Sequence, residues 1–294
     1  MSTTSTADAG NRSGDLHPAP FTSHFIEAGG LRLHYLEYGN RPTADRPVML
    51  CLHGGAAHAH WFDFVAPDLL RDHRVIALDQ RGHGDSQWAD PPVYTYDRYA
   101  ADLAEVVGKL DLRDFVLVGH SMGGIVSLLY AATYPGRLGR LVIADSIQRM
   151  TEERAATLRE VGTREGSRYA TREEFVSRFR LRPAGTTAAP GIIRHLAEHS
   201  ARHFPDGTWR HKFDRNVYAL REVSDGMANW SRIAVPALLV KAARSPRISP
   251  EILAEVRSHR PEVAFAEVAD SDHHVTLDNP SGFVRAVRAF LEKR

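Results

Sequence analysis

Hydrophobic residues along this chain gather in short continuous runs, and stretches with helical periodicity separate them. Continuous runs are typical of strands covered on both faces of a parallel sheet, because such strands lose the alternation of a half-exposed strand. The runs lie at 48–52, 74–79, 115–118, 141–145, 236–241 and 262–268. Their alternation with helical stretches predicts an α/β fold, in which a mostly parallel sheet carries helices on both faces.

The helical stretches and one hairpin complete this sheet domain. In 96–110, Tyr99 and Leu103 recur on one face, as in an amphipathic helix. Two alternating segments near the start, 24–27 and 31–38, predict a β-hairpin. Further helices are predicted near 61–71, after the run 115–118, and at 281–292.

The pattern changes between residues 148 and 230, where the hydrophobic runs disappear. Charged segments with helical character replace them, and prolines interrupt these segments. The segments lie at 151–165, 172–182 and 192–202. We therefore expect a helical cap, 148–230, inserted into a core made of 21–147 and 231–294. Residues 1–20 are rich in small and polar side chains and predict a disordered tail.

Composition narrows the classes of function and location. The chain has 294 residues, 43% of them hydrophobic and 25% charged, with a formal net charge of +1, which does not favour nucleic acid as a partner. No segment approaches the roughly 20 apolar residues of a membrane span, and the N-terminus lacks the hydrophobic core of a secretory signal. We expect a cytoplasmic protein that acts on a small molecule, without a membrane partner. The sequence does not indicate an oligomeric state.

A single cysteine, Cys51, lies within the hydrophobic run 48–52. One cysteine cannot form an internal disulfide. A free cysteine in such a run is most often a small buried side chain. We therefore expect Cys51 to pack in the core.

A serine lies where one strand passes sharply into a helix. The hydrophobic run 115–118 ends in Gly-His-Ser-Met-Gly-Gly, residues 119–124, and a helical stretch follows. Gly119 and Gly123 flank Ser121 at positions where a side chain would collide in so tight a turn. The pattern G-x-S-x-G between a strand and a helix predicts a nucleophilic serine.

Four motifs in this order make the chain resemble the α/β-hydrolase fold superfamily. They are His-Gly-Gly at 53–55, Asp-Gln-Arg-Gly-His-Gly-Asp-Ser at 79–86, the serine turn at 119–124 and Asp-His-His-Val-Thr-Leu-Asp-Asn-Pro at 272–280. The resemblance covers the chain from about residue 25 to its end. It implies a serine nucleophile, Ser121, under a helical cap, with no cofactor and no metal ion. It also implies that the motif at 79–86 is structural.

The resemblance also implies where the base lies. In this fold the triad follows the order serine, acid, histidine. The family places its histidine seven residues before the proline of the Asn-Pro pair, which corresponds to His273 here. Its neighbour His274 is the alternative base.

The position of the catalytic acid departs from the commonest pattern of the family. Many members carry an aspartate shortly after the strand at 238–241, but Ser245 stands at that position here. A serine cannot supply the negative charge that stabilises an imidazolium ion. Some members, including cofactor-free ring dioxygenases and an amide hydrolase of vitamin B6 breakdown, carry the acid at the end of the strand after the helix that follows the serine turn. Here that strand is 141–145, which implies Asp145. Alternatively, Asp145 caps the first cap helix, and weaker candidates for the acid are Asp270 and Asp272.

An oxyanion needs hydrogen-bond donors near the nucleophile. By resemblance, these are the N–H groups of Met122 and Gly55, with Ala56 next to the latter. Side chains that could contact substrate are His53, Trp209, Trp230, the cap arginines at 154, 159, 168, 194 and 202 and the cap histidines at 195, 199 and 203. His53 is more often a support for its loop in this family.

These expectations favour a serine hydrolase that forms an acyl-enzyme with an ester, a lactone, an amide or an activated C–C bond. A serine at the turn excludes the routes of haloalkane dehalogenases and epoxide hydrolases of this fold, which use an aspartate there. Two alternatives stay open. One is a cofactor-independent dioxygenase, in which His273 deprotonates a hydroxy-heteroaromatic compound. The other is a ligand sensor without turnover.

Overall fold

The computed structural model describes residues 17–39 and 46–293. Most of the predicted tail, 1–20, lies outside the described residues. Its last part does not behave as a tail, because Ala19 is buried and its N–H donates to the carbonyl oxygen of Asp63 at 2.9 Å. The packed chain therefore begins before residue 21.

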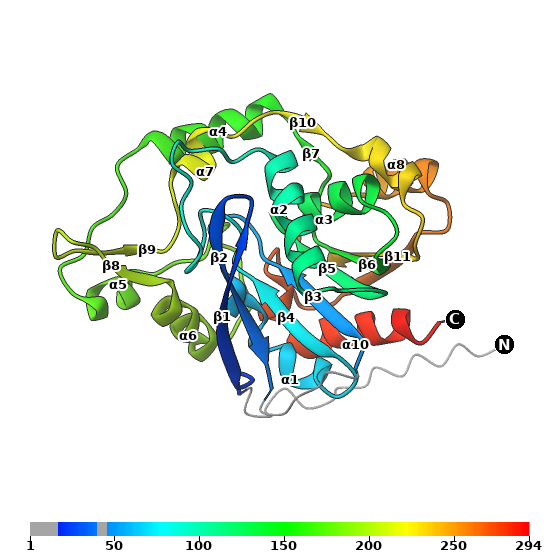
Figure 1. The fold of residues 1–294 in the computed structure, drawn as a ribbon, viewed down its shortest axis with the longest axis horizontal. Coiled ribbons are helices and arrows are strands. Elements are labelled where there is room, and N and C mark those ends of the chain that lie inside the picture. Colours follow the sequence, from blue (N-terminus) through cyan, green and yellow to red (C-terminus); the bar gives the residue numbers. More distant parts are fainter. Residues whose placement is uncertain (1–16, 40–45, 294) are drawn as a thin grey trace.

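An eight-stranded sheet forms the centre of the molecule (Figure 1). In spatial order its strands are β1 (Phe21–Ala28), β2 (Leu31–Tyr38), β4 (Arg74–Leu78), β3 (Val48–Leu52), β5 (Phe115–His120), β6 (Leu138–Ala144), β11 (Ala237–Ala242) and β12 (Ala264–Val268). The hairpin β1–β2 pairs antiparallel, and so does β2 with β4. All other neighbours are parallel. The predicted α/β class is confirmed.

Helices cover both faces of this sheet, and two hydrophobic clusters separate them from it. One face carries α2 (Tyr96–Lys109), α3 (Met122–Thr133) and α8 (Pro250–His259). The other carries α1 (Ala66–Leu69) and α10 (Pro280–Leu291), with the short α9 (Val275–Asp278) just before α10. Cys51 is fully buried in β3, as predicted, and burial raises the pKa of its thiol.

Two elements of the core differ from the predictions. The segment 61–71 is not one helix but a 3₁₀ turn, η1 (Ala59–Phe62), followed by α1. Nearly all of its first half is buried, so its hydrophobic pattern reflects full burial rather than one helical face. The sequence pattern also missed α8, because only Val256 of that helix is buried and the hydrophobic signal is correspondingly weak.

The segment between β6 and β11 lies over one end of the sheet in Figure 1. Its helices are α4 (Glu152–Thr163), α5 (Arg172–Arg178), α6 (Pro190–Ser200), α7 (Asn216–Ala219) and the 3₁₀ helix η2 (Met227–Arg232). It also holds two strand pairs that the sequence did not predict, β8 (Ala201–His203) with β9 (Trp209–His211) and β7 (Arg149–Met150) with β10 (Ser224–Asp225). Strands of two or three residues are too short to give a hydrophobic alternation.

None of the helices in the described ranges has the length and hydrophobicity that a membrane crossing requires.

Candidate active site

The turn between β5 and α3 holds Ser121 in a strained conformation, with φ of +53° and ψ of −116°. A Cβ atom on Gly119 would lie 2.4 Å from the carbonyl oxygen of Gly123, and one on Gly123 would lie 2.4 Å from that of Leu52. Both distances are shorter than any real contact, so only glycine fits at these positions. The turn therefore presents Ser121 at the carboxyl end of β5, at the start of a helix.

His273 connects Ser121 to Asp145. Its Nε2 lies 2.9 Å from Ser121 Oγ, and its Nδ1 lies 2.8 Å from Asp145 Oδ2. The three side chains come from segments that follow β5, β6 and β12. The structure thus brings together the three residues that the sequence nominated.

Asp145 sits in a buried network of donors. The hydroxyl of Ser245 donates to its Oδ2 at 2.6 Å, and the N–H of Ala242 donates to its Oδ1 at 3.2 Å. Burial raises the pKa of Asp145, and these two hydrogen bonds oppose the rise. Asp145 does not cap the first cap helix, because the side chain of Thr151 caps α4. Both ring nitrogens of His273 are engaged by Ser121 and Asp145, and Asp270 is ion-paired with Arg244.

Burial holds the pKa of His273 well below its ordinary value, and the positive charge of Arg247 adds to this effect. Its imidazole is therefore neutral at pH 7 and able to accept a proton. His120 donates from its Nε2 to the carbonyl oxygen of His273 at 2.7 Å and so holds the loop of His273. His274 is hydrogen-bonded to the carbonyl oxygen of Pro183 at 2.9 Å instead of meeting the serine.

Two main-chain N–H groups lie where oxyanion donors are expected. Met122 is the first residue of α3, and Gly55 lies in the turn that the N–H of Ala57 closes onto the carbonyl of Gly54. Within the described residues, neither the N–H of Met122 nor that of Gly55 donates to a main-chain carbonyl. Both residues line the same cavity as Ser121.

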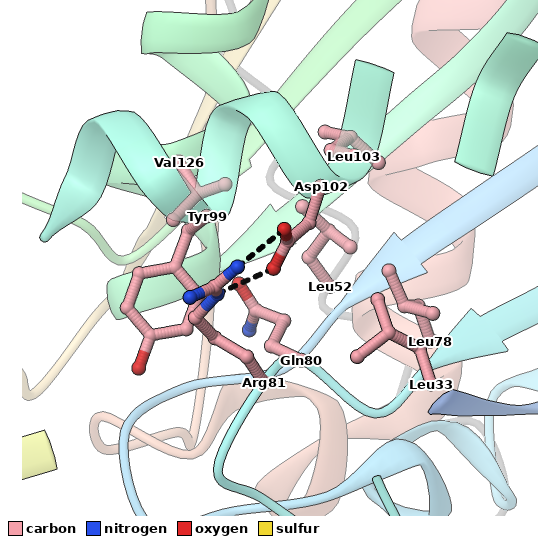
Figure 2. A pocket seen from close by; sticks show the side chains of 9 residues that line it. All are labelled: Leu33, Leu52, Leu78, Gln80, Arg81, Tyr99, Asp102, Leu103 and Val126. Atoms are coloured by element: carbon pink, nitrogen blue, oxygen red, sulfur yellow. Dashed lines mark hydrogen bonds and ion pairs between the residues drawn. The ribbon is translucent and has the colours of Figure 1, made fainter. Parts of the chain in front are cut away.

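The motif at 79–86 supports the loop of Gly55. The N–H of Gln80 donates to His53 Nε2 at 3.1 Å, and its side-chain amide donates to the carbonyl oxygen of His53 at 2.8 Å. Arg81 forms a buried ion pair with Asp102 of α2, with N···O distances of 2.5 and 2.6 Å (Figure 2). Figure 2 shows hydrophobic side chains around this pair, including Leu33 and Leu103. These contacts give the motif a structural role.

A cavity of about 770 Å³ opens above Ser121. The described residues that line this cavity do not include His53, Trp209 or Trp230, which were nominated for substrate contact. His53 is fully buried and its Nδ1–H donates to the carbonyl oxygen of Gly54 at 2.7 Å. Trp230 packs in the core, and Trp209 pairs with Tyr169 in the cap. A tryptophan packs in a core as readily as it binds a ligand, so residue type alone predicted the wrong side chains for the cavity lining.

Arginines dominate the lining instead. They are Arg149, Arg154, Arg164, Arg180, Arg182, Arg215, Arg221 and Arg247, against two acids, Glu153 and Glu165. Of the five cap arginines nominated from the sequence, only Arg154 is among them. The other four lie elsewhere, for example Arg159, which is ion-paired with Glu152. No sequence signal distinguished the lining arginines, because their position depends on how the segment between β6 and β11 folds over the sheet.

Arg221 is the most buried of these arginines, with 4% of its surface exposed. Its guanidinium contacts the sulfur of Met122 at 3.6 Å and lies 5.1 Å from the centre of the Tyr96 ring. Among the described residues, no carboxylate pairs with the side chain of Arg221, Arg154 or Arg247. A buried guanidinium without a counter-ion is costly, so these positions suit an anionic ligand.

Comparison with known proteins agrees with this fold. The model of the alpha/beta hydrolase fold family matches residues 47–280. An esterase of Mycobacterium tuberculosis is 29% identical over 262 residues, which are 84% of each chain. The 2-(acetamidomethylene)succinate hydrolase of Mesorhizobium japonicum is 28% identical and covers 95% of this chain and 98% of its own. A crystal structure of E-2-(acetamidomethylene)succinate hydrolase superposes with a TM-score of 0.80 at 26% identity, over 93% of this chain and 100% of that one.

Proposed function

This chain belongs to the alpha/beta hydrolase fold family, and from that premise we propose that it is a serine hydrolase that works through a covalent acyl-enzyme. The observation that carries the proposal is the continuous chain of contacts from Ser121 Oγ through His273 to Asp145, at 2.9 and 2.8 Å. A hydroxyl is a weak nucleophile unless a base removes its proton, and a third group must orient that base. Here both partners lie within hydrogen-bonding distance.

In the first half of the reaction, Ser121 Oγ attacks the carbonyl carbon of the substrate, and His273 Nε2 takes the hydroxyl proton. Asp145 accepts a hydrogen bond from Nδ1–H and stabilises the imidazolium ion that forms. The N–H groups of Met122 and Gly55 donate to the oxyanion. The tetrahedral intermediate collapses when His273 gives its proton to the leaving group, which departs as an alcohol or an amine.

In the second half, a water molecule enters the cavity and attacks the acyl carbon. His273 takes a proton from this water, and a second oxyanion forms against the same two N–H groups. Collapse of that intermediate returns the proton to Ser121 Oγ and releases the carboxylic acid. The sum is the hydrolysis of one acyl bond, and the enzyme ends in its starting protonation state.

We further propose that the substrate carries a carboxylate. The lining has eight arginines and two acids, so its electrostatic potential attracts anions. Arg154 and Arg247 both lower the pKa of His273, which indicates that their charges act at the catalytic centre. The related hydrolase from Mesorhizobium japonicum is named for a succinate that bears an acetamidomethylene group. An N-acyl or ester derivative of a carboxylic acid fits both observations.

The serine mechanism is tested with a fluorophosphonate probe and mass spectrometry. We expect the probe to modify Ser121 in the wild type and to leave a folded Ser121→Ala variant unmodified. Oxygen uptake with hydroxy-heteroaromatic compounds is measured on the same samples. A folded wild type that takes up oxygen, resists the probe and hydrolyses no ester would refute the proposal.

The substrate class is tested with two esters that differ in one charge, 4-nitrophenyl hydrogen adipate and methyl 4-nitrophenyl adipate. We expect Arg154→Met and Arg247→Met to raise KM for the anionic ester and to leave KM for the neutral ester nearly unchanged. Arg159→Met is the matched control, because this cap arginine pairs with Glu152 and does not line the cavity. Equal changes for both esters would contradict a carboxylate-binding role.

A further inference from the structure

Four potential metal ligands meet outside the catalytic cavity, where the core contacts the cap. They are His60, Asp63, His195 and His199, here called the histidine–aspartate cluster. Each offers one ligand atom, and these four atoms all lie within 4.8 Å of one another. None of the four residues is among those that line the cavity above Ser121. The catalytic mechanism therefore leaves the cluster without a role.

Two elements of the fold, η1 and α6, bring these four side chains together. His60 lies in η1 and Asp63 follows it three residues later, so both lie on one side of the same turn. His195 and His199 are four residues apart on α6 and share one face of that helix. α6 packs directly against η1. Residues more than 130 positions apart in sequence thus face one another.

Asp63 is the centre of the cluster. It is fully buried, and one oxygen, Oδ2, lies 2.9 Å from His60 Nδ1 and 2.6 Å from His195 Nε2. The hydroxyl of Tyr38 donates to the other oxygen at 2.8 Å. A hydrogen bond to the second oxygen of a carboxylate is the outer contact that orients a carboxylate ligand in metal sites.

His199 has no hydrogen-bonding role of its own. Its ring stacks on that of His60 with 3.7 Å between the ring centres, and its nitrogens have no partner among the described residues. Its ring nitrogens are therefore available as metal ligands.

We propose that the histidine–aspartate cluster binds one divalent transition-metal ion of the zinc type, which ties the cap helix α6 to the core. Three imidazoles and one carboxylate are a donor set that zinc accepts, whereas calcium and magnesium prefer oxygen ligands. Bonds of about 2.0–2.1 Å in a tetrahedral site place neighbouring ligand atoms roughly 3.3 Å apart. The contacts to Asp63 Oδ2, at 2.6 and 2.9 Å, are shorter than that value, and the limit of 4.8 Å is longer. Binding therefore requires the stacked rings of His60 and His199 to turn until their nitrogens point at one ion.

A second group of possible ligands serves as a contrast. His34, Asp79 and Asp85 also lie close together. However, Asp79 already accepts from the N–H groups of Ala59 and Asp85, at 2.7 and 2.9 Å, as well as from His34. That carboxylate is satisfied by the main chain and holds the turn at 79–86. The histidine–aspartate cluster has no main-chain donor to its ligand atoms among the described residues.

The ion would also bear on the catalytic cavity without taking part in the reaction. Trp61 lies in η1 next to His60 and lines the cavity. η1 in turn follows the loop that carries Gly55. An ion that joins η1 to α6 therefore fixes one wall of the cavity and the cap at the same time. We expect its removal to loosen the cap rather than to abolish the chemistry.

The test uses the full-length protein, freed of metal with EDTA and then desalted. Titration with ZnCl₂ by calorimetry should show one equivalent bound per chain. Replacement with CoCl₂ should give the strong visible absorption of tetrahedral cobalt. Zinc should also raise the melting temperature of the wild type and slow proteolysis within 148–230.

Two variants make the result specific. His199→Ala removes a half-buried ligand without hydrogen-bond partners and should still fold, yet it should lower zinc affinity at least about 10-fold. Asp63→Asn is a second variant, which removes the central charge. His203→Ala is the control, because this exposed histidine of β8 is outside the cluster. No saturable binding to the wild type, or equal binding to His199→Ala and His203→Ala, would overturn the proposal.

Discussion

Ser245 stands where many members of the family carry the catalytic acid, and its hydroxyl donates to Asp145. Ser245 therefore keeps a hydrogen bond at that position, while the carboxylate that contacts His273 is Asp145, directly after β6. Asp145 itself has φ of +42°, a conformation that non-glycine residues rarely adopt. Strain of this kind persists only where the surroundings enforce it, and here it directs the carboxylate at His273.

The acid assignment gives the first prediction. Asp145→Asn should lower kcat by about 10³–10⁴-fold, because an amide cannot stabilise the imidazolium ion or select the correct tautomer. Asp270→Asn is the control, since Asp270 pairs with Arg244. Kinetics with 4-nitrophenyl acetate, together with circular dichroism of both variants, provide the measurement. A larger loss in Asp270→Asn than in Asp145→Asn would rule out Asp145 as the acid.

The second prediction concerns pH. Burial and then Arg247 lower the pKa of His273, and only the neutral imidazole can act as base, so activity is lost only when pH falls through this lowered pKa. The acidic limb of kcat/KM for a neutral ester should thus lie below pH 6.5. Arg247→Met removes a positive charge and should move this limb to higher pH. Arg244→Met, on the exposed side of the same loop, is the control and should leave the acidic limb in place. A limb that moves to lower pH in Arg247→Met would contradict the charge effect.

At the scale of elements, the turn from β5 to α3 depends on contacts with β3. Gly123 packs against the carbonyl oxygens of Leu52 and His53, and its own N–H donates to the latter at 3.1 Å. The turn of Ser121 and the loop of Gly55 are therefore held by one set of main-chain contacts. This explains why a short glycine pattern in the sequence predicts the local structure of the turn.

This contact gives the third prediction. Gly123→Ala places a methyl group 2.4 Å from main-chain oxygen and should cost about 1–3 kcal/mol or more of stability, and activity should fall with the displaced loop. Gly108→Ala is the matched control, since nothing lies within 4 Å of its added Cβ on an exposed part of α2. It should stabilise the protein by about 0.5–1 kcal/mol. Urea unfolding measures both, and equal effects would refute the steric account.

At the scale of the molecule, the sequence predicted the strands of the sheet and the turn of Ser121, because buried strands and tight turns leave local patterns. His273 and Asp145 were nominated by the resemblance to the family, and the structure places both in contact with one another beside Ser121. It did not predict the lining of the cavity or the histidine–aspartate cluster. Both depend on how segments between β6 and β11 fold back onto the core, which no local pattern encodes. His53, Trp209 and Trp230 were nominated by residue type alone, and burial in the core or cap accounts for each of them.

The small net charge of the whole chain does not reveal the positive charge of its cavity. Net charge is only +1, yet the residues that line the cavity include eight arginines and only two acids. A concentrated positive potential inside a low-dielectric wall attracts an anion over several ångströms, and dissolved ions screen this attraction with a length of about 10 Å at 0.1 M salt.

The last prediction follows from this contrast. Raising NaCl from about 20 mM to about 500 mM, which shortens the screening length severalfold, should lower kcat/KM for 4-nitrophenyl hydrogen adipate several-fold. The same change should leave methyl 4-nitrophenyl adipate nearly unaffected, because a neutral ester gains nothing from the field. If both esters respond equally, salt acts on the fold or the cap, and the arginines do not select the substrate by its charge.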